Sequence, residues 1–269
     1  MRAPPTPLPQ LNELLAALVD GQRRVLGEGL IGTYLQGSFA AGDWDASSDV
    51  DWVAAIAEPL TDAQVEALQA LAVRLFAWPT PWAQHLEGSY ITVDALRDLG
   101  DRPLQHWYLD NGSVRLERSD HDNTRVVRWT LEHHGIALHG PSAATLVAPV
   151  PDAALREEVH AVFRDWAADL TRERISTRWY QPFVVLSYCR MLHTLSEGGV
   201  FSKRAGADWG REHLDPRWHG LISRAWAERE DIWPKVFLAA DPEEVRATLA
   251  FVEYATALAD RLMGQSAAT

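Results

Sequence analysis

Two short apolar segments, residues 30–36 and 49–57, flank a turn that is rich in Gly, Ser and Asp. The first segment, LIGTYLQ, carries the β-branched and aromatic residues that are typical of strands. In the second segment, DVDWVAAIA, successive residues would point to opposite faces of a strand, so Asp49 and Asp51 share one face. The chain is therefore expected to form a sheet that carries two carboxylates on one side, just after a Gly-rich turn.

Residue spacing predicts further elements in the first half. Apolar residues recur at helical intervals in 11–26 and in 61–76, and Thr61 is a suitable N-cap for the second of these helices. Residues 86–93 predict a third strand, on which Glu87 would share a face with other alternate residues. The first half thus combines strands and helices.

A connection rich in Pro and Gly, residues 139–152, marks a domain boundary. Only helical patterns follow it. The helices predicted there cover residues 152–170, 181–197, 202–214 and 241–264. The expected fold class is α+β: residues 1–150 form a domain with a small mixed sheet flanked by helices, and residues 151–269 form an all-α bundle, with a cleft between them.

Composition and charge indicate the expected location of the protein and the class of partner that it is expected to bind. It has one cysteine in 269 residues, so no intrachain disulfide can form, and its N-terminus lacks the apolar stretch of a signal peptide. No run approaches 18 uncharged apolar residues, so no membrane span is expected, and the expected location is the cytoplasm. The formal net charge of −12 disfavours a nucleic-acid partner and favours a cationic one, although acidity also serves solubility alone.

The paired acids suggest a metal-dependent chemistry. Asp49 and Asp51 lie roughly 7 Å apart along a strand, close enough to share hard cations. Mg²⁺ takes one or two carboxylates together with substrate phosphates, and such a pair can clamp the oxygens of a phosphoryl transfer. Gly37 and Ser38, on the turn before a short helix, can offer backbone N–H groups and a hydroxyl to phosphate. Glu87, on the neighbouring strand, is placed to act as the base that takes a proton from a substrate hydroxyl.

The stretch GSFAAGDWDASSDVD resembles the Gly-Ser … Asp-x-Asp signature of the DNA-polymerase-β-like nucleotidyltransferase superfamily. The later stretch VVLSYCRMLHTLSEGGVFSKRAGADW resembles the helical domain of the aminoglycoside adenylyltransferases that modify streptomycin and spectinomycin. In that family an arginine on one helix and a lysine that opens the next contact the nucleotide phosphates, and the matching positions are Arg190 and Lys203. LEGSYI resembles the strand whose glutamate is the family's catalytic base, which corresponds to Glu87.

This resemblance implies an adenylyltransferase that uses ATP and Mg²⁺. It would transfer AMP to a hydroxyl of a small acceptor, such as a cationic aminoglycoside antibiotic, and release pyrophosphate. In this assignment Asp49 and Asp51 bind Mg²⁺ and Glu87 is the base. The residues expected to hold the triphosphate are Gly37, Ser38, Ser48, Arg190 and Lys203. The serine before the first aspartate has a second interpretation, since it could simply turn the chain. A monomer or weak dimer is expected.

Three places depart from the family pattern. Tyr180 stands near the position where the streptomycin-modifying enzymes carry an acid that anchors a cationic drug. Trp107 is the candidate for the family's substrate-facing tryptophan. The segment SDHDNTRVVRW, residues 119–129, has no counterpart that the resemblance identifies. The nucleotide half of the expected site therefore matches the family more closely than the acceptor half.

Other interpretations stay open at this point. Asp94 is the second candidate for the base, although it is also expected to be the N-cap of the next helix. The acceptor could instead be a protein or RNA hydroxyl, or the chain could be an inactive nucleotide sensor, against which the presence of all three carboxylates counts. A zinc site at His133, His134 and His139 is not expected, because no cysteine accompanies them, and Cys189 is expected in the core.

Overall fold

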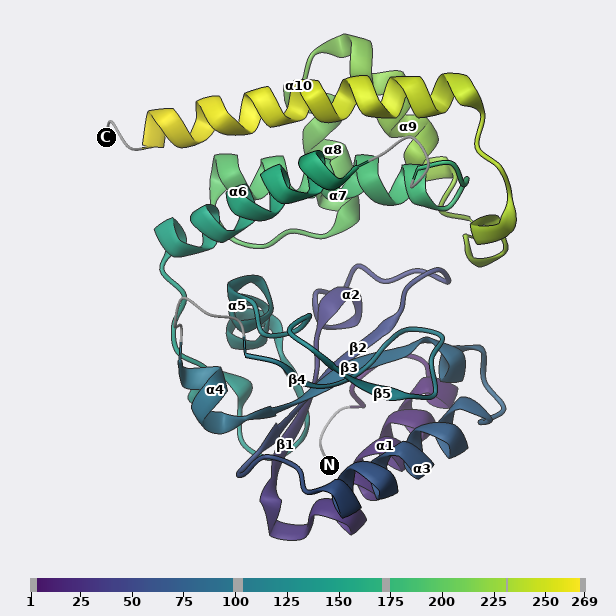
Figure 1. Ribbon diagram of the computed structural model, residues 1–269, viewed down its shortest axis with the longest axis vertical. Helices are drawn as coiled ribbons and strands as arrows, with labels where there is room; N and C mark the ends of the chain where they lie inside the picture. The colour runs from purple at the N-terminus through teal and green to yellow at the C-terminus, as the bar shows by residue number, and fades with distance from the viewer. Residues whose placement is uncertain (1–3, 99–103, 171–174, 231, 267–269) are drawn as a thin grey trace. The chain divides into compact units, whose positions relative to one another are not determined.

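The computed structural model describes residues 4–98, 104–170, 175–230 and 232–266 (Figure 1). The chain groups into two compact units. The N-terminal unit comprises Met1–Trp44 and Ser48–Val150, and the helical unit comprises Pro151–Thr269 together with the short segment Asp45–Ser47. Within the described ranges, no helix is both long enough and apolar enough to cross a membrane.

A six-stranded mixed sheet forms the centre of the N-terminal unit (Figure 1). Its strands lie in the order β5-β4-β3-β2-β1-β6, and only β2 and β3 are parallel neighbours. The strands are β1 Leu30–Leu35, β2 Val50–Ile56, β3 Leu86–Thr92, β4 His106–Leu109, β5 Leu116–Ser119 and β6 Ile136–His139. Because β2 and β3 are parallel, the residues at their N-terminal ends meet at the same edge of the sheet.

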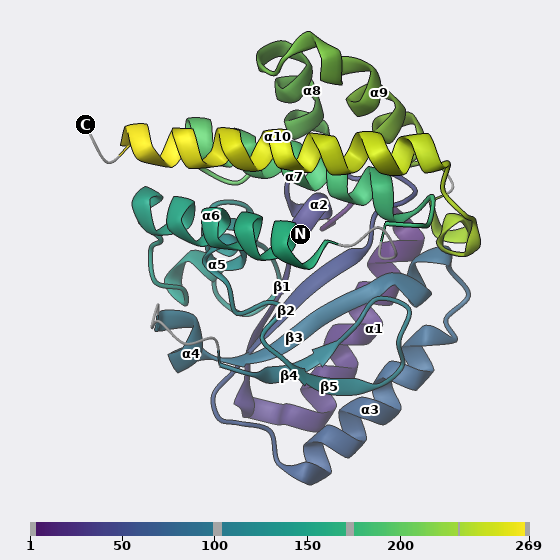
Figure 2. The ribbon, with the colours of Figure 1, turned by 45° about the horizontal axis from the view of Figure 1, so that its top comes forward.

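Helices cover both faces of this sheet (Figures 1 and 2). The helices α1 (Pro9–Leu26) and α3 (Asp62–Phe76) pack side by side on one face. The shorter helices α4 (Val93–Arg97) and α5 (Arg125–His134) pack on the other. The one-turn helix α2 (Gly37–Ala40) follows β1 and contacts β2.

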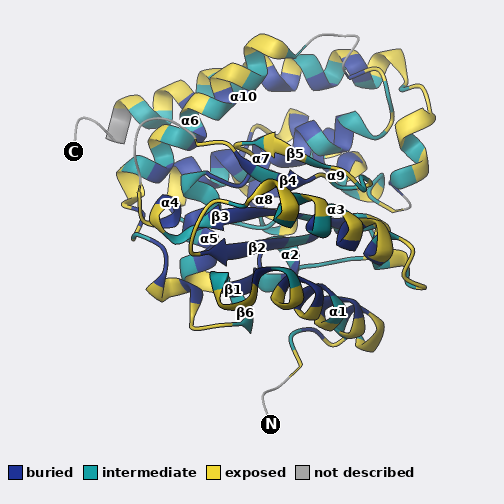
Figure 3. Ribbon diagram, turned by 60° about the horizontal axis from the view of Figure 1, so that its bottom comes forward, coloured by how far each residue is buried: buried dark blue, intermediate teal, exposed yellow. Residues whose placement is uncertain are grey.

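The alternation of side chains along β2 divides the core between the two faces. Trp52 and Ala54 pack with the leucines of α1 and α3, whereas Val53 and Ala55 pack with residues of α4 and α5. Figure 3 shows the central strands buried and the outer surfaces of α1 and α3 exposed. Asp51 is two residues before Val53, so its side chain lies on the α4–α5 face, beyond the last apolar residue of that face.

Five α-helices form the helical unit in the part of the chain that the structure describes. They are α6 Asp152–Asp169, α7 Tyr180–Glu197, α8 Lys203–His213, α9 His219–Ala227 and α10 Pro242–Ser266. The helix α7 is central, since the other four all pack against it, and α10 runs alongside it in Figures 1 and 2. Gly198 and Gly199 end α7 with φ angles of 77° and 76°, which residues with a side chain rarely adopt.

The fold class predicted from the sequence is confirmed: a mixed sheet with helices comes first and helices alone follow. Thr61 caps α3 as predicted, through a capping box with Gln64. The predicted N-cap of α4 is wrong. Thr92 has that place, because its side chain accepts a hydrogen bond from the N–H of Ala95, and Asp94 lies in the first turn. This helix begins where β3 ends, without a separate turn.

The sequence patterns do not predict β4, β5, β6 or α9. The three strands have four residues each, too few for alternation to stand out. The strand β5 reads LERS and lies at the edge of the sheet, with Glu117 and Arg118 exposed, so it has no continuous apolar face. The strand β4 and the turn that follows β5 each supply one neighbour of Glu87.

Candidate active site

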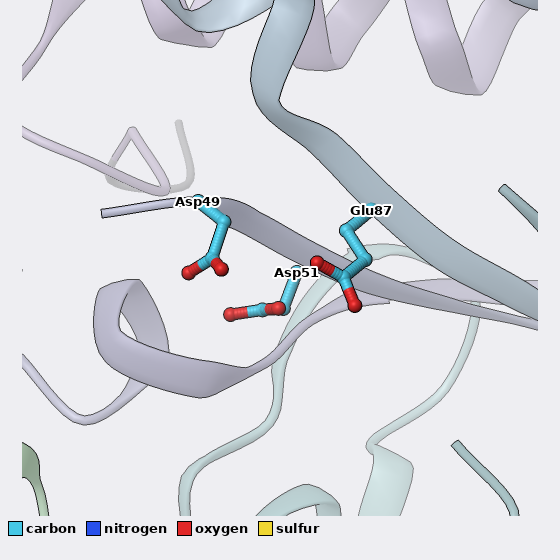
Figure 4. Close-up of side chains that lie close together, drawn as sticks. All are labelled: Asp49, Asp51 and Glu87. Carbon is cyan, nitrogen blue, oxygen red and sulfur yellow. The ribbon is translucent and has the colours of Figure 1, made fainter. Parts of the chain in front are cut away.

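Three carboxylates lie together at the N-terminal ends of β2 and β3, and Figure 4 shows them grouped there. Asp49 immediately precedes β2, and Asp51 pairs with Glu87 in the parallel register of β2 and β3. One oxygen of each carboxylate lies within 4.8 Å of the others, and all three residues are half-buried. No other cluster of three His, Cys, Asp or Glu side chains comes this close among the described residues. Oxygen donors at this spacing could hold a hard divalent cation.

Two simple rules of strand geometry produce this cluster. Asp49 and Asp51 point to one side because they are two residues apart on an extended chain. Glu87 lies beside them because β3 is the parallel neighbour of β2 and Glu87 is directly opposite Asp51. The structure thus brings together the three acids that the sequence analysis selected.

Gly37 lets the start of α2 come close to Asp51. Its φ is +64°, and a Cβ at this position would lie 2.7 Å from Asp51 Cγ, a distance that real side chains do not tolerate. The N–H of Gln36 donates to the carbonyl of Asp51 at 2.9 Å, which holds the chain against β2. This position therefore requires glycine on two grounds, its backbone conformation and the space taken by the carboxylate.

Gly37 and Ser38 are the first two residues of α2, whereas the sequence analysis placed them on a turn before a short helix. The Ser38 hydroxyl is buried and has no hydrogen-bond partner in the protein. Buried polar groups are rarely left unpaired in native proteins. The Ser38 hydroxyl lies one residue from Gly37, which packs against Asp51. It is therefore suited to donate a hydrogen bond to an oxygen of a bound ligand.

Two side chains donate to the same oxygen of Glu87. The hydroxyl of Tyr108 donates to Oε1 at 2.6 Å, and Nε2 of His121 lies 3.1 Å from the same oxygen. The two rings also stack, with centroids 5.0 Å apart. The hydrogen bond to Glu87 raises the pKa of His121, and burial together with the charge of Glu87 raises the pKa of Tyr108. Both groups are therefore donors at neutral pH.

Asp122 connects this region to the start of α2. It is 5% exposed, and each of its oxygens accepts a hydrogen bond: Oδ2 from the hydroxyl of Ser89 at 2.7 Å, and Oδ1 from Nε2 of Gln36 at 3.3 Å. Burial raises the pKa of Asp122 from 3.8 to about 6. Ser89 follows Glu87 on the same face of β3, so Asp122 ties the strand of Glu87 to the residue before Gly37.

Tyr108, His121 and Asp122 are absent from the residues selected by the sequence analysis. The signal that could have found two of them is the concentration of titratable side chains in SDHDN, residues 119–123, a segment without a family counterpart. Nothing in the sequence marks Tyr108, because its role depends on the pairing of β4 with β3, where it lies opposite Ser89.

The helical unit holds Arg190 on α7 and Lys203 as the first residue of α8. Ser202 caps α8 through its side chain. A Cβ on Gly206 would lie 2.7 Å from both Cα and N of Arg190, so glycine lets the first turn of α8 pack directly against α7 at this residue. Nζ of Lys203 lies 5.7 Å from the ring centroid of Phe183, which is also on α7. Both predicted cations thus come from one helix pair.

Trp107 does not lie near the carboxylates. It is on β4 next to Tyr108, and because successive strand residues point to opposite faces, it lies on the face away from Glu87. There it packs against the core formed with α1 and α3, with the Arg118 guanidinium 5.4 Å from the ring centroid. The expectation that Trp107 faces a substrate is therefore wrong for the site formed by the three acids.

The remaining residues named in the sequence analysis have the following places. Ser48 is buried directly before Asp49, and Tyr180 is the first residue of α7. Cys189 is buried in α7, where burial raises its pKa to about 12, so it is a core residue as expected. His133 stacks on Trp129 at 4.0 Å, and the described histidines join no group with metal-ligand spacing.

The comparison with protein families gives a match to the second half of the chain. The family described as "Aminoglycoside adenylyltransferase, C-terminal domain" matches residues 145–254. This range includes α7 and α8, which carry Arg190 and Lys203.

Curated relatives and a solved structure extend the similarity to most of the chain. The aminoglycoside (3'') (9) adenylyltransferases of Klebsiella pneumoniae, Shigella flexneri and Escherichia coli are each 24% identical to it over 233 residues, which cover 80% of this chain and 82% of the relative. Spectinomycin adenyltransferase AAD(9) from Enterococcus faecialis, solved with ATP and spectinomycin, has the same fold. Its TM-score is 0.68 at 16% identity, covering 91% of this chain and 98% of that one. The chain is thus similar to aminoglycoside adenylyltransferases over most of its length, and its residues 145–254 match the C-terminal domain of that family.

Proposed function

We propose that this protein transfers AMP from ATP to a hydroxyl of a small, aminoglycoside-like acceptor, in a Mg²⁺-dependent reaction that releases pyrophosphate. The observation that carries this proposal is the cluster of Asp49, Asp51 and Glu87, with mutual oxygen distances within 4.8 Å. The similarity to aminoglycoside adenylyltransferases supports the reaction class. The N-terminal unit would carry the catalytic acids, and the helical unit would contribute cations that bind the nucleotide.

Asp49 and Asp51 would hold the metal. Their carboxylates are hard oxygen donors on one side of β2, and the donor set of the cluster fits Mg²⁺, which takes few protein ligands and completes its shell with water and phosphate oxygens. When bound, Mg²⁺ would neutralise the negative charge that develops on the phosphates. Asp49 and Asp51 would fix the position of the cation relative to the phosphates.

Glu87 would act as the general base. Its Oε1 is engaged by Tyr108 and His121, so Oε2 is the oxygen available to accept a proton. The acceptor hydroxyl oxygen would form a bond to the α-phosphorus while its proton passes to Glu87. The bond between the α-phosphorus and the bridging oxygen breaks, and pyrophosphate leaves with that oxygen. A positioned base of this kind contributes about 10²- to 10⁴-fold to the rate.

Five residues would hold the triphosphate: Gly37, Ser38, Ser48, Arg190 and Lys203. The buried Ser38 hydroxyl without a protein partner supports this role most directly. The close packing of α8 on α7 at Gly206 supports a joint role for the two cations. Catalysis in this arrangement consists mainly of orientation and charge neutralisation, as in other phosphoryl transfers.

The acceptor is proposed to be a cationic or polyhydroxylated antibiotic of the aminoglycoside type. The curated relatives are named for aminoglycoside modification, and the solved relative binds spectinomycin. The formal net charge of −12 favours such an acceptor over an anionic one.

The test is a panel assay with the purified protein. ATP labelled at the α-phosphate is incubated with Mg²⁺ and a set of aminoglycosides and aminocyclitols that includes streptomycin and spectinomycin. We expect labelled AMP-drug product from at least one acceptor, with an equal amount of pyrophosphate. If no compound is modified, the antibiotic acceptor is wrong. Calorimetry of ATP with and without Mg²⁺ then separates an enzyme with another acceptor, which needs the metal for tight binding, from a metal-independent sensor.

A further inference from the structure

The hydrogen bonds of Glu87 are distributed unevenly between its two oxygens. Tyr108 donates to Oε1 at 2.6 Å, and His121 lies 3.1 Å from Oε1 as well. For a carboxylate that only needed stabilisation, donors on both oxygens would serve equally well. Two donors on one oxygen fix the direction of the other, because the carboxylate can no longer rotate without losing both bonds.

The two donors reach Glu87 from one hairpin. Tyr108 is on β4, which pairs with β3, and His121 is in the turn that follows β5. The Tyr108 hydroxyl also lies 3.0 Å from Oδ1 of Asp110, but the contact with Glu87 is the shorter. The His121 ring stacks on Tyr108, so each donor restricts the movement of the other.

The turn that carries His121 is anchored although the side chain itself is 58% exposed. The hydroxyl of Ser119 accepts from the N–H of His121 at 3.2 Å. Asp122 is buried and bonded to Ser89 and Gln36, and the side chain of Asn123 donates to the carbonyl of Leu104 at 3.2 Å. The backbone on both sides of His121 is thus held, and an exposed imidazole on a fixed turn can serve as a reliable donor.

We propose that Tyr108 and His121 are positioning residues for the transfer reaction: they clamp Oε1 of Glu87 so that Oε2 is presented to the acceptor hydroxyl. This inference rests on the proposed function of Glu87 as the base. It assigns a role to the segment after β5, which the family resemblance left without one. A side chain misplaced by about 1 Å can lower the rate of a reaction about 100-fold, so the clamp has a measurable effect on turnover.

The first test is kinetic. The variants His121→Ala and Tyr108→Phe remove one donor each, His121→Gln keeps an N–H donor, and Asp120→Ala changes an exposed residue of the same turn as a control. We expect kcat to fall about 10- to 100-fold in the first two, with the KM for ATP changed less than about twofold. His121→Gln should recover a large part of the loss, and Asp120→Ala should match the wild type. A kcat within about twofold of the wild type in both donor variants would overturn the proposal, and so would equal losses in His121→Ala and Asp120→Ala.

The second test does not depend on activity. Crystal structures of the wild type and of the double variant Tyr108→Phe/His121→Ala report the orientation of the Glu87 carboxylate. We expect one orientation in the wild type and a changed or multiple orientation in the double variant. An unchanged single orientation in the double variant overturns the clamp even if the enzyme is active. A wild type that modifies no acceptor, combined with a carboxylate that moves when its donors are removed, refutes the proposed function and leaves the clamp in place.

Discussion

The α-carbon of Gly37 packs against the carboxylate of Asp51, so closely that a methyl group on Gly37 would lie 2.7 Å from Asp51 Cγ. The backbone of Gly37 also has a φ of +64°, which disfavours any side chain. The start of α2 and one of the three acids therefore depend on each other for their position. This contact joins the expected phosphate-binding residues to the expected metal ligand.

Gly37→Ala is predicted to abolish most of the activity. The methyl group must displace either Asp51 or the start of α2, so AMP transfer should fall by about 100-fold or more, consistent with the cost of small misplacements at a reacting centre. Steady-state transfer assays measure the loss of activity, and the thermal midpoint of unfolding measures any loss of stability. Gly42→Ala is the matched control, because Gly42 also has a positive φ, 73°, but no atom lies within 4 Å of its Cβ position. It should lose only about 1 kcal/mol of stability and keep its activity.

Glu87→Gln is predicted to lower kcat by about 10²- to 10⁴-fold, because the amide cannot take the proton of the acceptor hydroxyl. Binding of ATP with Mg²⁺, measured by calorimetry, should remain within a few-fold of the wild type. Asp94→Asn is the control, since Asp94 is exposed in the first turn of α4 and is the second candidate for the base. Loss of turnover in Asp94→Asn with normal turnover in Glu87→Gln would reverse the assignment of the base.

Arg190→Ala and Lys203→Ala are predicted to weaken the binding of ATP. Each removes a charge-assisted contact to phosphate, which is worth about 1.5–3 kcal/mol, so the KM for ATP should rise about 10-fold or more for each variant. Arg211→Ala is the control on α8, because Arg211 forms a surface ion pair with Asp208 and has no assigned phosphate contact. An unchanged KM for ATP in both test variants, with normal folding, would refute their role.

Asp122→Asn is predicted to change the pH dependence of stability. The pKa of Asp122 is raised from 3.8 to about 6 in the folded state, so the folded state binds the proton more tightly than the unfolded state. In the wild type this group therefore costs stability as the pH rises from about 4 to about 6, by an amount on the order of 2 kcal/mol. Urea unfolding in the presence of EDTA should show that the asparagine variant gains stability relative to the wild type as the pH rises from about 4 to about 6. A difference that does not vary with pH would contradict this prediction.

The sequence predicts the parts of the site that depend on short-range rules. Alternation along the strand places Asp49 and Asp51 on one side, and the same rule together with the family resemblance selects Glu87 on the third strand. The parallel pairing that puts Glu87 opposite Asp51 comes from the structure. The capping of α3 by Thr61 follows from local chemistry in the same way.

The clamp on Glu87 could not be predicted, because it depends on long-range pairing. Tyr108 reaches Glu87 only because β4 pairs with β3 in the register that places Tyr108 opposite Ser89. The strands β4 and β5 are four residues long and have no clear periodicity, so neither their pairing nor the position of His121 can be read from the chain. Trp107 is a candidate for the site only through the family resemblance, and the alternation of β4 turns it to the opposite face.

The measurement that tests the central claim most directly is the transfer of label from α-labelled ATP to an acceptor found in the panel assay, with and without Mg²⁺, for the wild type, Asp49→Asn and Asp51→Asn. The account predicts labelled product from the wild type only when Mg²⁺ is present, and a loss of about 100-fold or more in each variant, because the amides are poor ligands for a hard cation. Product formation by the wild type in EDTA, or full activity in either variant with Mg²⁺, would contradict it.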